Sequence, residues 1–485
     1  MSKDDIFDKK IKKTLKQEIN NIPDNINYVF DTAINKCVKH KRFKLKQAAG
    51  ICAACLMITV ILGITASTYA SNIPILKDIF KTFKLNRYEN YDMYASDINV
   101  TKESNGIKMT INKVVYDGLD LELFYTLEFQ EPINKKPDFK DINIEINGKE
   151  VNFGYGASGE FYNDNKTYVG RIDYSIVSKS MIPEDMSEFN DNAIDIPGQF
   201  MLNVIFNKIQ VRGDEKYIKG KWKFDIPVSN ESTRGKVKEY DTKIDLSNIQ
   251  KGLKVNKITT TPINTVLQIS NRDSNRDNAE NILNFLAFDD KGRCIERKSL
   301  SSRGKRDKED EYMELTNIHF KEPYEDTKSI TFIPYHMIFD EERLKSSRSN
   351  SDSALAGKES SDGRIEIKLN LNGETKLATK DGKDYGVITK VEVLDDKTNL
   401  YYKPTIGNYN IFEQIYNNNK TYDVAYPVYH GKYKDEVTTK YINETGEFVV
   451  QFNKPLTSDE YILSYYDNSK IEVYYFDKAF TFNIN

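Results

Sequence analysis

The chain has 485 residues, of which 29% are charged and 39% hydrophobic, and its formal net charge is −3. This balance excludes a disordered chain, and the length exceeds that of one ordinary domain, so about three domains are expected. Only one of the four cysteines, Cys294, follows residue 55, which excludes a disulfide-stapled scaffold for the long C-terminal part.

The small net charge hides a basic N-terminal head. Residues 1–46 contain twelve Lys or Arg and six Asp or Glu, a net of +6 that leaves −9 for the remaining residues. Apolar residues recur there every three or four positions, with a break at Pro23 and a capping residue at Asp24, which predicts two amphipathic helices. The apolar positions that we expect to bind a partner are Phe7, Ile11, Leu15, Ile19, Ile26, Val29, Phe30 and Ile34.

The apolar faces of so short a helix pair need another surface to cover them. A cytoplasmic protein could hold them in a groove, or the inner membrane leaflet could attract their lysine-rich flanks. A solvated segment that only directs membrane insertion is the third interpretation. Direct nucleic-acid binding is not expected, because no groove-reading motif accompanies the basic charge.

An apolar run follows the head and predicts a transmembrane helix over residues 47–70. Residues 47–76 contain no charged side chain. A helix over residues 48–70 would be about 34 Å long, enough to cross a hydrocarbon core of about 30 Å. The positive-inside rule places the N-terminus in the cytoplasm and the bulk of the chain outside. The basic residues that set this orientation are Lys39, Lys41, Arg42, Lys44 and Lys46.

Two rival interpretations of the apolar run remain. Small residues ending at Ala70 resemble a signal-peptidase site, in which case the mature chain would begin at Ser71. A buried core helix is the other rival, but the length of the run and its flanking lysines argue against it. Cys52 and Cys55 have CxxC spacing, yet lipid disfavours the thiolates that a metal or redox site needs, so small packing residues explain them better.

The rest of the chain has the alternating apolar and polar residues that are typical of half-buried antiparallel strands. Residues 142–146 and 365–371 alternate apolar and polar side chains, and each run ends at an Asn-Gly turn. The sequence therefore predicts a mainly β protein with tandem sandwich-like domains. Its expected parts are a juxtamembrane segment (71–96), a first β-rich domain (97–230), a second (231–343), a polar loop or linker (344–363) and a third β-rich unit (364–485).

A weak internal repeat supports the tandem arrangement. Residues 106–115, 252–258 and 385–393 each form a strand-like run that is followed by a turn and a second run. The interval is about 140 residues, the length of one domain.

No residue pattern indicates catalysis, a metal site or a cofactor. The four histidines, His40, His319, His336 and His430, do not pair at ligand spacing. A Ser-x-x-Lys spacing at Ser302 lacks its companion motifs, and the many carboxylates are explained by solvated faces. The sequence gives no reason to expect an enzyme.

Several stretches resemble a known family of membrane-anchored proteins from low-GC Gram-positive bacteria, which carry an uncharacterised extracytoplasmic domain. The stretches that carry the resemblance are residues 69–75, 78–80, 94–107, 222–228 and 330–335. Members are often encoded beside sigma factors of the extracytoplasmic-function (ECF) group and are taken to be their anti-sigma partners. The resemblance implies that the head binds an ECF-type sigma factor and that the β-rich part senses an envelope signal. The alternative is a membrane-anchored binding or adhesion module with no sigma partner.

Overall fold

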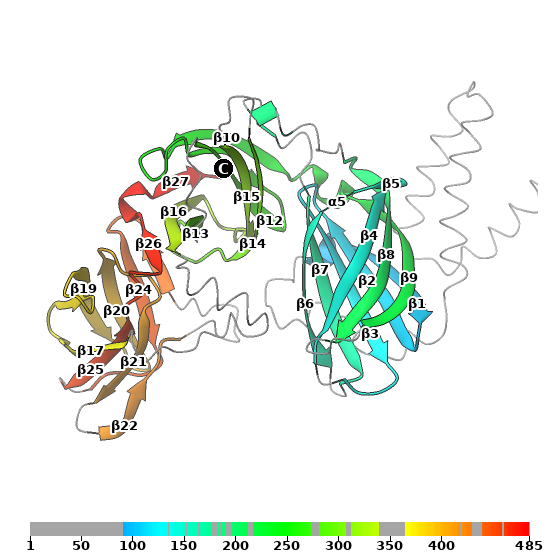
Figure 1. Ribbon diagram of the computed structural model, residues 1–485. Coiled ribbons are helices and arrows are strands. Elements are labelled where there is room, and N and C mark those ends of the chain that lie inside the picture. Colours follow the sequence, from blue (N-terminus) through cyan, green and yellow to red (C-terminus); the bar gives the residue numbers. More distant parts are fainter. Residues whose placement is uncertain are drawn as a thin grey trace, which may run out of the picture. The chain divides into compact units, whose positions relative to one another are not determined.

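The computed structural model describes residues 91–484 with several internal gaps. These gaps are 134, 152, 163–164, 177–181, 184–185, 188, 190–195, 212–216, 274–280, 307–311, 339–363, 418–419, 429–438 and 458–459. The predicted helix pair and membrane helix lie outside the described residues. Among the residues that are described, no helix is long and apolar enough to cross a membrane. The expectation of a mainly β protein is confirmed for these residues, in which antiparallel sheets account for almost all regular structure (Figure 1).

The first set of strands forms two sheets that enclose one core. The larger sheet has the order β1 (Ala95–Ser104), β2 (Ile107–Tyr116), β3 (Asp120–Phe129), β7 (Thr167–Ser175), β6 (Gly154–Tyr162). The smaller sheet has the order β5 (Lys149–Glu150), β4 (Pro137–Ile146), β8 (Gln199–Val211), β9 (Tyr217–Ser229). Their alternating apolar residues point toward one another, so the pair is a β-sandwich.

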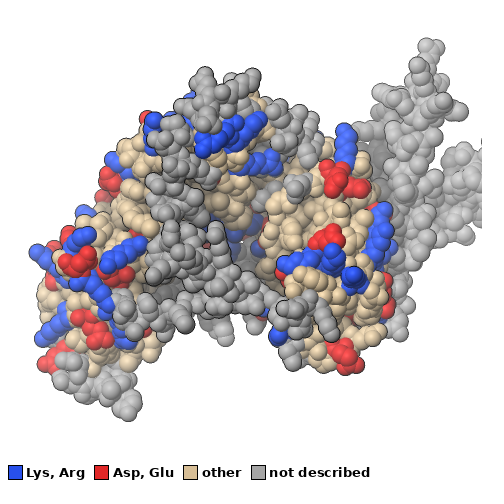
Figure 2. Space-filling model, in the orientation of Figure 1, with Lys and Arg blue, Asp and Glu red and all other residues tan. Residues whose placement is uncertain are grey.

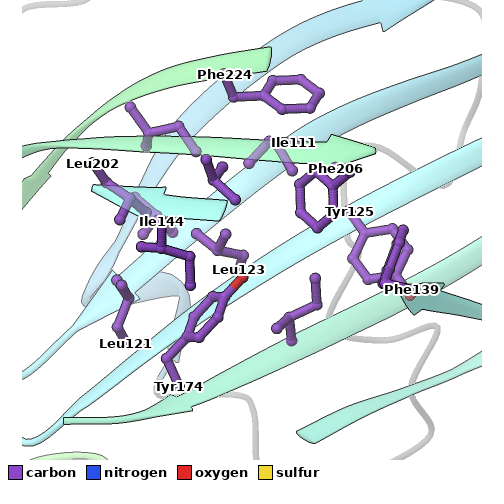
Figure 3. Close-up of a cluster of buried hydrophobic side chains, with 14 of the residues drawn as sticks. Ile111, Leu121, Leu123, Tyr125, Phe139, Ile144, Tyr174, Leu202, Phe206 and Phe224 are labelled. Carbon is purple, nitrogen blue, oxygen red and sulfur yellow. The ribbon is translucent and has the colours of Figure 1, made fainter. Parts of the chain in front are cut away.

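Side chains from both sheets fill the core of this first sandwich (Figure 3). Leu121, Leu123 and Tyr125 point inward from one face of β3, as the period of two along a strand requires. Trp222 is the only tryptophan in the chain; it is fully buried here, and its indole N–H donates to the Ile107 carbonyl oxygen at 3.0 Å.

The second set of strands begins after the short helix α5 (Glu231–Arg234). One sheet has the order β10 (Lys238–Asp245), β11 (Lys254–Thr260), β12 (Asn264–Asp273), β15 (Tyr312–Lys321), β14 (Arg297–Arg306). The other pairs β13 (Asn281–Asp289) with β16 (Ser329–Ile338), and β16 in turn pairs with β26 (Glu472–Tyr474) and β27 (Phe480–Asn483).

The third set also has two sheets. One has the order β18 (Thr375–Ala378), β19 (Asp384–Val393), β20 (Thr398–Pro404), β24 (Glu447–Phe452), β23 (Thr439–Ile442). The other has the order β17 (Arg364–Leu369), β25 (Tyr461–Tyr466), β21 (Phe412–Asn417), β22 (Lys420–Ala425).

The three larger sheets share one strand order, which confirms the repeat expected from the sequence. In each, three consecutive strands are followed by a later hairpin whose second strand pairs with the third, as β7, β15 and β24 do. The equivalent hairpins β2–β3, β11–β12 and β19–β20 each contain a register shift, at Asn112, Asn256 and Thr389 respectively.

The side chain of the bulged residue bonds the neighbouring strand in all three hairpins. The Asn112 side-chain oxygen accepts from the Thr126 hydroxyl at 2.9 Å, and that of Asn256 accepts from the Ser270 hydroxyl at 3.1 Å. Thr389 donates its hydroxyl to the Tyr401 carbonyl at 3.3 Å. A polar side chain that bonds the neighbouring strand suits a position where the ladder is interrupted, so the three bulges are one repeated feature.

The second and third sets exchange their closing strands. In the first sandwich β9 pairs with β8 and closes the smaller sheet. The strand that follows β16 along the chain, β17, instead pairs with β25 of the third set, while β26 and β27 take the place beside β16. The expected third unit of residues 364–485 thus ends in two strands that belong to a sheet of the second set.

Apolar and aromatic contacts join the second set to the third. The Phe288 ring lies 5.4 Å from that of Tyr441 and 5.6 Å from that of Phe448, centroid to centroid. The backbone also approaches closely, since the Tyr441 N–H donates to the Gly292 carbonyl oxygen at 3.0 Å. One continuous hydrophobic cluster includes Leu286 and Ile333 of the second set and the core of the third.

The substitution Gly292→Ala is expected to destabilise this junction. Gly292 has φ +74°, and a Cβ there would collide with the Tyr441 carbonyl oxygen. Gly382→Ala is the matched control, because Gly382 has φ +80° but nothing within 4 Å of an added Cβ. We expect a cost of about 1 kcal/mol for the control and about 2 kcal/mol more for Gly292→Ala, measured by urea unfolding with near-UV circular dichroism. Equal costs would contradict the close approach.

Candidate functional site

The partner-binding positions predicted in the head, from Phe7 to Ile34, and the orienting basic residues from Lys39 to Lys46 lie outside the described residues. Among the residues that are described, no group of three or more His, Cys, Asp or Glu side chains is arranged to hold a metal ion. The most unusual chemistry in this region is a set of charged and polar side chains, most of them buried, between the first and second sandwiches. We call this set the polar junction; its members are Tyr91, Asp117, Asp120, Glu122, Arg171, Asp173, Thr261, Asn264, Lys298 and His319.

Asp117 joins two equivalent hairpin turns. It lies in the β2–β3 turn, where its Oδ1 accepts from the backbone N–H groups of Leu119 and Asp120, both at 2.8 Å. Its Oδ2 accepts from the Thr261 hydroxyl and the Asn264 amide of the β11–β12 turn, both at 2.7 Å. The Asp117 carboxylate, which is 1% exposed, accepts all four hydrogen bonds. Both sandwiches therefore supply donors to this one buried group.

Lys298 is the central cation of the polar junction. It is the bulged residue of β14, where the register with β15 shifts between Arg297 and Ser299. Its ammonium donates to Glu122 Oε1 and Asn264 Oδ1, both at 2.6 Å, and to the Tyr91 hydroxyl at 2.8 Å. A bulge redirects a side chain, and here it directs an ammonium into a buried site rather than into water.

A buried histidine and carboxylate form a second link. His319, on β15, is fully buried, and its Nδ1 lies 3.0 Å from Asp120 Oδ1. Its Nε2 has no hydrogen-bond partner among the described residues. Asp120 also lies 3.9 Å from the Lys298 ammonium, so this carboxylate faces two groups of the second sandwich.

A third pair lies behind Glu122 within the first sandwich. Arg171 donates to Asp173 Oδ2 at 2.7 Å, and another of its nitrogens lies 3.8 Å from Glu122 Oε2. That distance exceeds a hydrogen bond, and Oε2 has no hydrogen-bond partner within the described ranges. The polar junction therefore holds four carboxyl groups against Lys298, Arg171 and His319.

Burial and the neighbouring charges shift the pKa values of Glu122, Asp120 and Lys298. Burial raises the pKa of Glu122 to about 8; Lys298 opposes the rise, and Asp173 and Asp120 add to it. Burial would also raise the pKa of Asp120, but His319 and Lys298 outweigh it and hold that pKa below its usual range. Burial lowers the pKa of Lys298, yet Glu122 and Asp120 outweigh it, so the pKa is raised and Lys298 stays cationic.

Several separate apolar clusters accompany the polar junction. Ile263 of the second sandwich packs with Tyr91 and Phe124, Leu119 packs with Val266, and Met186 and Phe189 pack with Met313 and Leu315 of β15. This differs from the junction of the second and third sets, which share one aromatic core. The first two sandwiches are thus joined by buried polar groups together with separate apolar clusters, a more polar interface than a shared core.

Sequence patterns do not single out the residues of the polar junction. Glu122 alternates with Leu121 and Leu123, a pattern that places it on the outer face of its strand and predicts solvent exposure. His319 stands in the sequence only as an isolated histidine. No local signal shows that the outer face of one sandwich is covered by another domain.

Comparisons with known proteins give two family matches. Residues 40–129 match a family described as "Domain of unknown function (DUF4179)", and residues 235–369 match one described as "Family of unknown function (DUF5643)". A search of curated proteins finds no match. Among solved structures, the conserved domain protein from Bacillus anthracis is similar, with 20% identity, a TM-score of 0.38, and coverage of 52% of this chain and 81% of that chain.

The substitution Lys298→Met is expected to weaken docking of the first sandwich on the second. Three buried acceptors would lose their common donor, at a cost of about 3 kcal/mol. Trp222 lies in the first sandwich, so its fluorescence during urea unfolding of the full chain reports loss of docking through a lower midpoint. Lys390→Met is the control. Lys390 forms an exposed ion pair with Glu392 at 3.0 Å in the third set, so its loss should not affect the first sandwich, which contains Trp222. An unchanged midpoint for Lys298→Met would contradict the assignment.

Docking is also expected to depend on pH through Glu122. Its pKa is about 8 in the folded chain, above that of an unfolded glutamate near 4.5. The proton bound to Glu122 therefore contributes its full stabilisation of the folded state below about pH 4.5. This stabilisation is lost as the pH rises from about 4.5 through 8, with a limiting slope of about 1.4 kcal/mol in the free energy of unfolding per pH unit. The Trp222 midpoint should fall between pH 5 and pH 8.

The variant Glu122→Gln mimics the protonated side chain and should remove most of this slope. Glu392→Gln, an exposed carboxyl group of the third set, should leave the slope as it is. A steep slope that persists in Glu122→Gln would assign the titration to another group.

Proposed function

We propose that the chain is a single-pass membrane regulator. In this proposal the head binds an ECF-type sigma factor in the cytoplasm, and the β-rich part lies outside the membrane and receives an envelope signal. The observation that carries the proposal is the extent of the first family match, residues 40–129. It starts within the lysine cluster, runs through the apolar segment, and ends at the last residue of β3.

That extent supports treating the membrane segment and the first sandwich as one unit. A basic flank, an apolar run and the first strands of an exported domain are the parts that an orientation with the N-terminus inside requires. The head adds two apolar faces that are too small to form a core of their own, which suits a partner that covers them.

The polar junction supports a role in signalling. A receptor needs an element with two arrangements of similar free energy. The second and third sets share an apolar core and exchanged strands, so they suit a single rigid body, whereas the first sandwich is joined to them by buried charges and separate apolar clusters. In the proposed mechanism a signal acts on the rigid body and changes its docking on the first sandwich, which is next to the membrane segment in the chain.

Leu15→Asp in the full chain is expected to abolish capture of the sigma factor. Leu15 is central to the apolar face of the first predicted helix, and an aspartate buried in a groove costs enough to weaken binding about a hundredfold. The measurement is co-purification of a co-expressed ECF-type sigma factor with the full chain from detergent-solubilised membranes. Phe30→Asp tests the second helix in the same way.

Gln17→Asp is the matched control, because it makes the same charge change on the opposite face of the same helix and should leave capture intact. Capture that survives both Leu15→Asp and Phe30→Asp would contradict the proposal. A gene neighbourhood without a sigma factor, together with normal function after deletion of residues 1–34, would favour the alternative of a membrane-anchored binding or adhesion module.

A further inference from the structure

The larger sheet of the first sandwich ends at β6, which pairs with β7 along one side (Figure 1). Among the described residues, no strand pairs with its other side. Residues 154–158, the first five of its nine residues, are all exposed. An exposed edge strand presents unpaired backbone N–H and C=O groups, so it can pair with a further strand.

The other long edge strands of the described sheets have features that hinder such pairing. β10 and β14 each contain a bulge and several charged side chains. β4, which β5 covers only at its end, starts with Pro137 and contains a residue with positive φ, Asp141. β13 is buried over residues 283–289. β1 and β9 lie beside each other, since the Lys221 N–H of β9 donates to the Ser104 hydroxyl of β1 at 3.1 Å.

β6 has none of these features. Residues 154–159 read Gly-Tyr-Gly-Ala-Ser-Gly, so they contain no charged side chain and no proline. The pairing of β6 with β7 runs from Gly154 to Tyr162 without a register shift. β6 is thus a regular, exposed edge to which a partner strand can add.

Two glycines of β6 are not required by the packing of the described residues. A Cβ added at Gly154 or Gly156 would meet nothing within 4 Å, whereas one at Gly159 would lie 2.4 Å from the Val169 carbonyl oxygen. Glycine weakens the interior of a strand, and it often marks a place where another backbone approaches closely. Gly154 and Gly156 therefore indicate a close approach by a backbone that the described residues do not supply.

The sequence of β6 is complementary to itself in an antiparallel arrangement. When Ala157 lies opposite Ala157 of a second copy, Tyr155 lies opposite Gly159 and Glu160 lies opposite Gly154. The two large side chains then face glycines, and the two copies of Glu160 do not face each other. An aromatic side chain opposite a glycine is a favourable cross-strand pair.

The position of Tyr155 leaves the backbone edge of β6 clear. Tyr155 lies opposite the core residue Tyr174, so its ring is on the core side of the sheet. Its hydroxyl donates to the Phe139 carbonyl oxygen at 3.1 Å, and its ring centroid lies 6.2 Å from that of Tyr174. The ring is nevertheless 43% exposed, so part of its surface is available to a second copy.

We propose that β6 is an interface between two copies of this chain. The two β6 strands pair antiparallel about a two-fold axis at Ala157, and two five-stranded sheets become one continuous sheet. The absence of charge over residues 154–159 lets identical edges meet without repulsion. The paired segment is short, so we expect a dissociation constant of about 10 µM. The interface does not depend on the head or on a sigma factor.

The first test is disulfide formation by Ala157→Cys in the full chain in detergent, with the native cysteines Cys37, Cys52, Cys55 and Cys294 replaced by alanine. Mild oxidation should convert most of this variant into a linked dimer, because the two Cα atoms would lie about 5 Å apart. Ser158→Cys is the matched control on the same exposed segment. Its two copies would lie about 8 Å apart, which is too far for a disulfide, so it should cross-link at least tenfold more slowly.

The second test measures the mass of the cysteine-containing native chain by light scattering in detergent, up to about 100 µM. Ala157→Lys places two ammonium groups opposite each other and should weaken the dimer at least tenfold. Gln199→Lys adds the same charge at an exposed position of β8 and should leave the dimer unchanged. The Trp222 unfolding midpoint checks that each variant is folded.

Three results would overturn the proposal: a native chain that stays monomeric at the highest concentration, a dimer that Ala157→Lys does not weaken, or equal cross-linking of Ala157→Cys and Ser158→Cys. The first would leave the β6 edge to an extended segment of another protein. None of these results bears on sigma-factor capture, which is measured through the head.

Discussion

The buried ammonium of Lys298 constrains how the first two sandwiches pack against each other. An ammonium removed from water needs an acceptor for each of its protons, and here the three acceptors come from both domains: Glu122 and Tyr91 from the first, and Asn264 from the second. Asp117 imposes the corresponding condition for a buried anion. Its carboxylate needs hydrogen-bond donors, and these come from its own β2–β3 turn and from the β11–β12 turn of the second sandwich. A slight displacement would leave several buried groups without partners at once, so the docked arrangement is specific.

The second and third sets are held together by a different kind of force. Their junction is made of aromatic rings and a shared core, and its separation would expose apolar surface that water does not satisfy. The exchanged closing strands also join the second and third sets, because β27 pairs with β16 and β17 pairs with β25. Phe480 of β27 packs on Phe332 of β16, so some of the core of the second sandwich is supplied by a segment that follows the third set in the chain. One architecture, repeated three times, is thus joined once by buried charges with separate apolar clusters and once by a shared aromatic core.

This division is consistent with the proposed regulator. The first sandwich follows the predicted membrane segment in the chain, so a change in its docking is the change that could be passed to a head on the other side. Acidic and basic side chains are mixed over the visible surface of the described residues (Figure 2).

The sequence by itself determined the β class, the hairpins and the repeat, because alternation and Asn-Gly turns act within a few residues of one another. The runs that contain Asn112, Asn256 and Thr389 resemble one another in their amino acids alone. It also determined the basic head and apolar run on which the proposed role rests, since these are properties of composition. The tertiary structure alone decided which outward-facing side chains are buried. Glu122 and Tyr217 both sit at outward positions of their strands, yet one is sealed inside the polar junction and the other is exposed. Strand periodicity tells the two faces of a sheet apart, but whether an outer face meets water or another domain depends on residues more than a hundred positions away, and the exchange of β17 and β27 depends on the same long-range pairing.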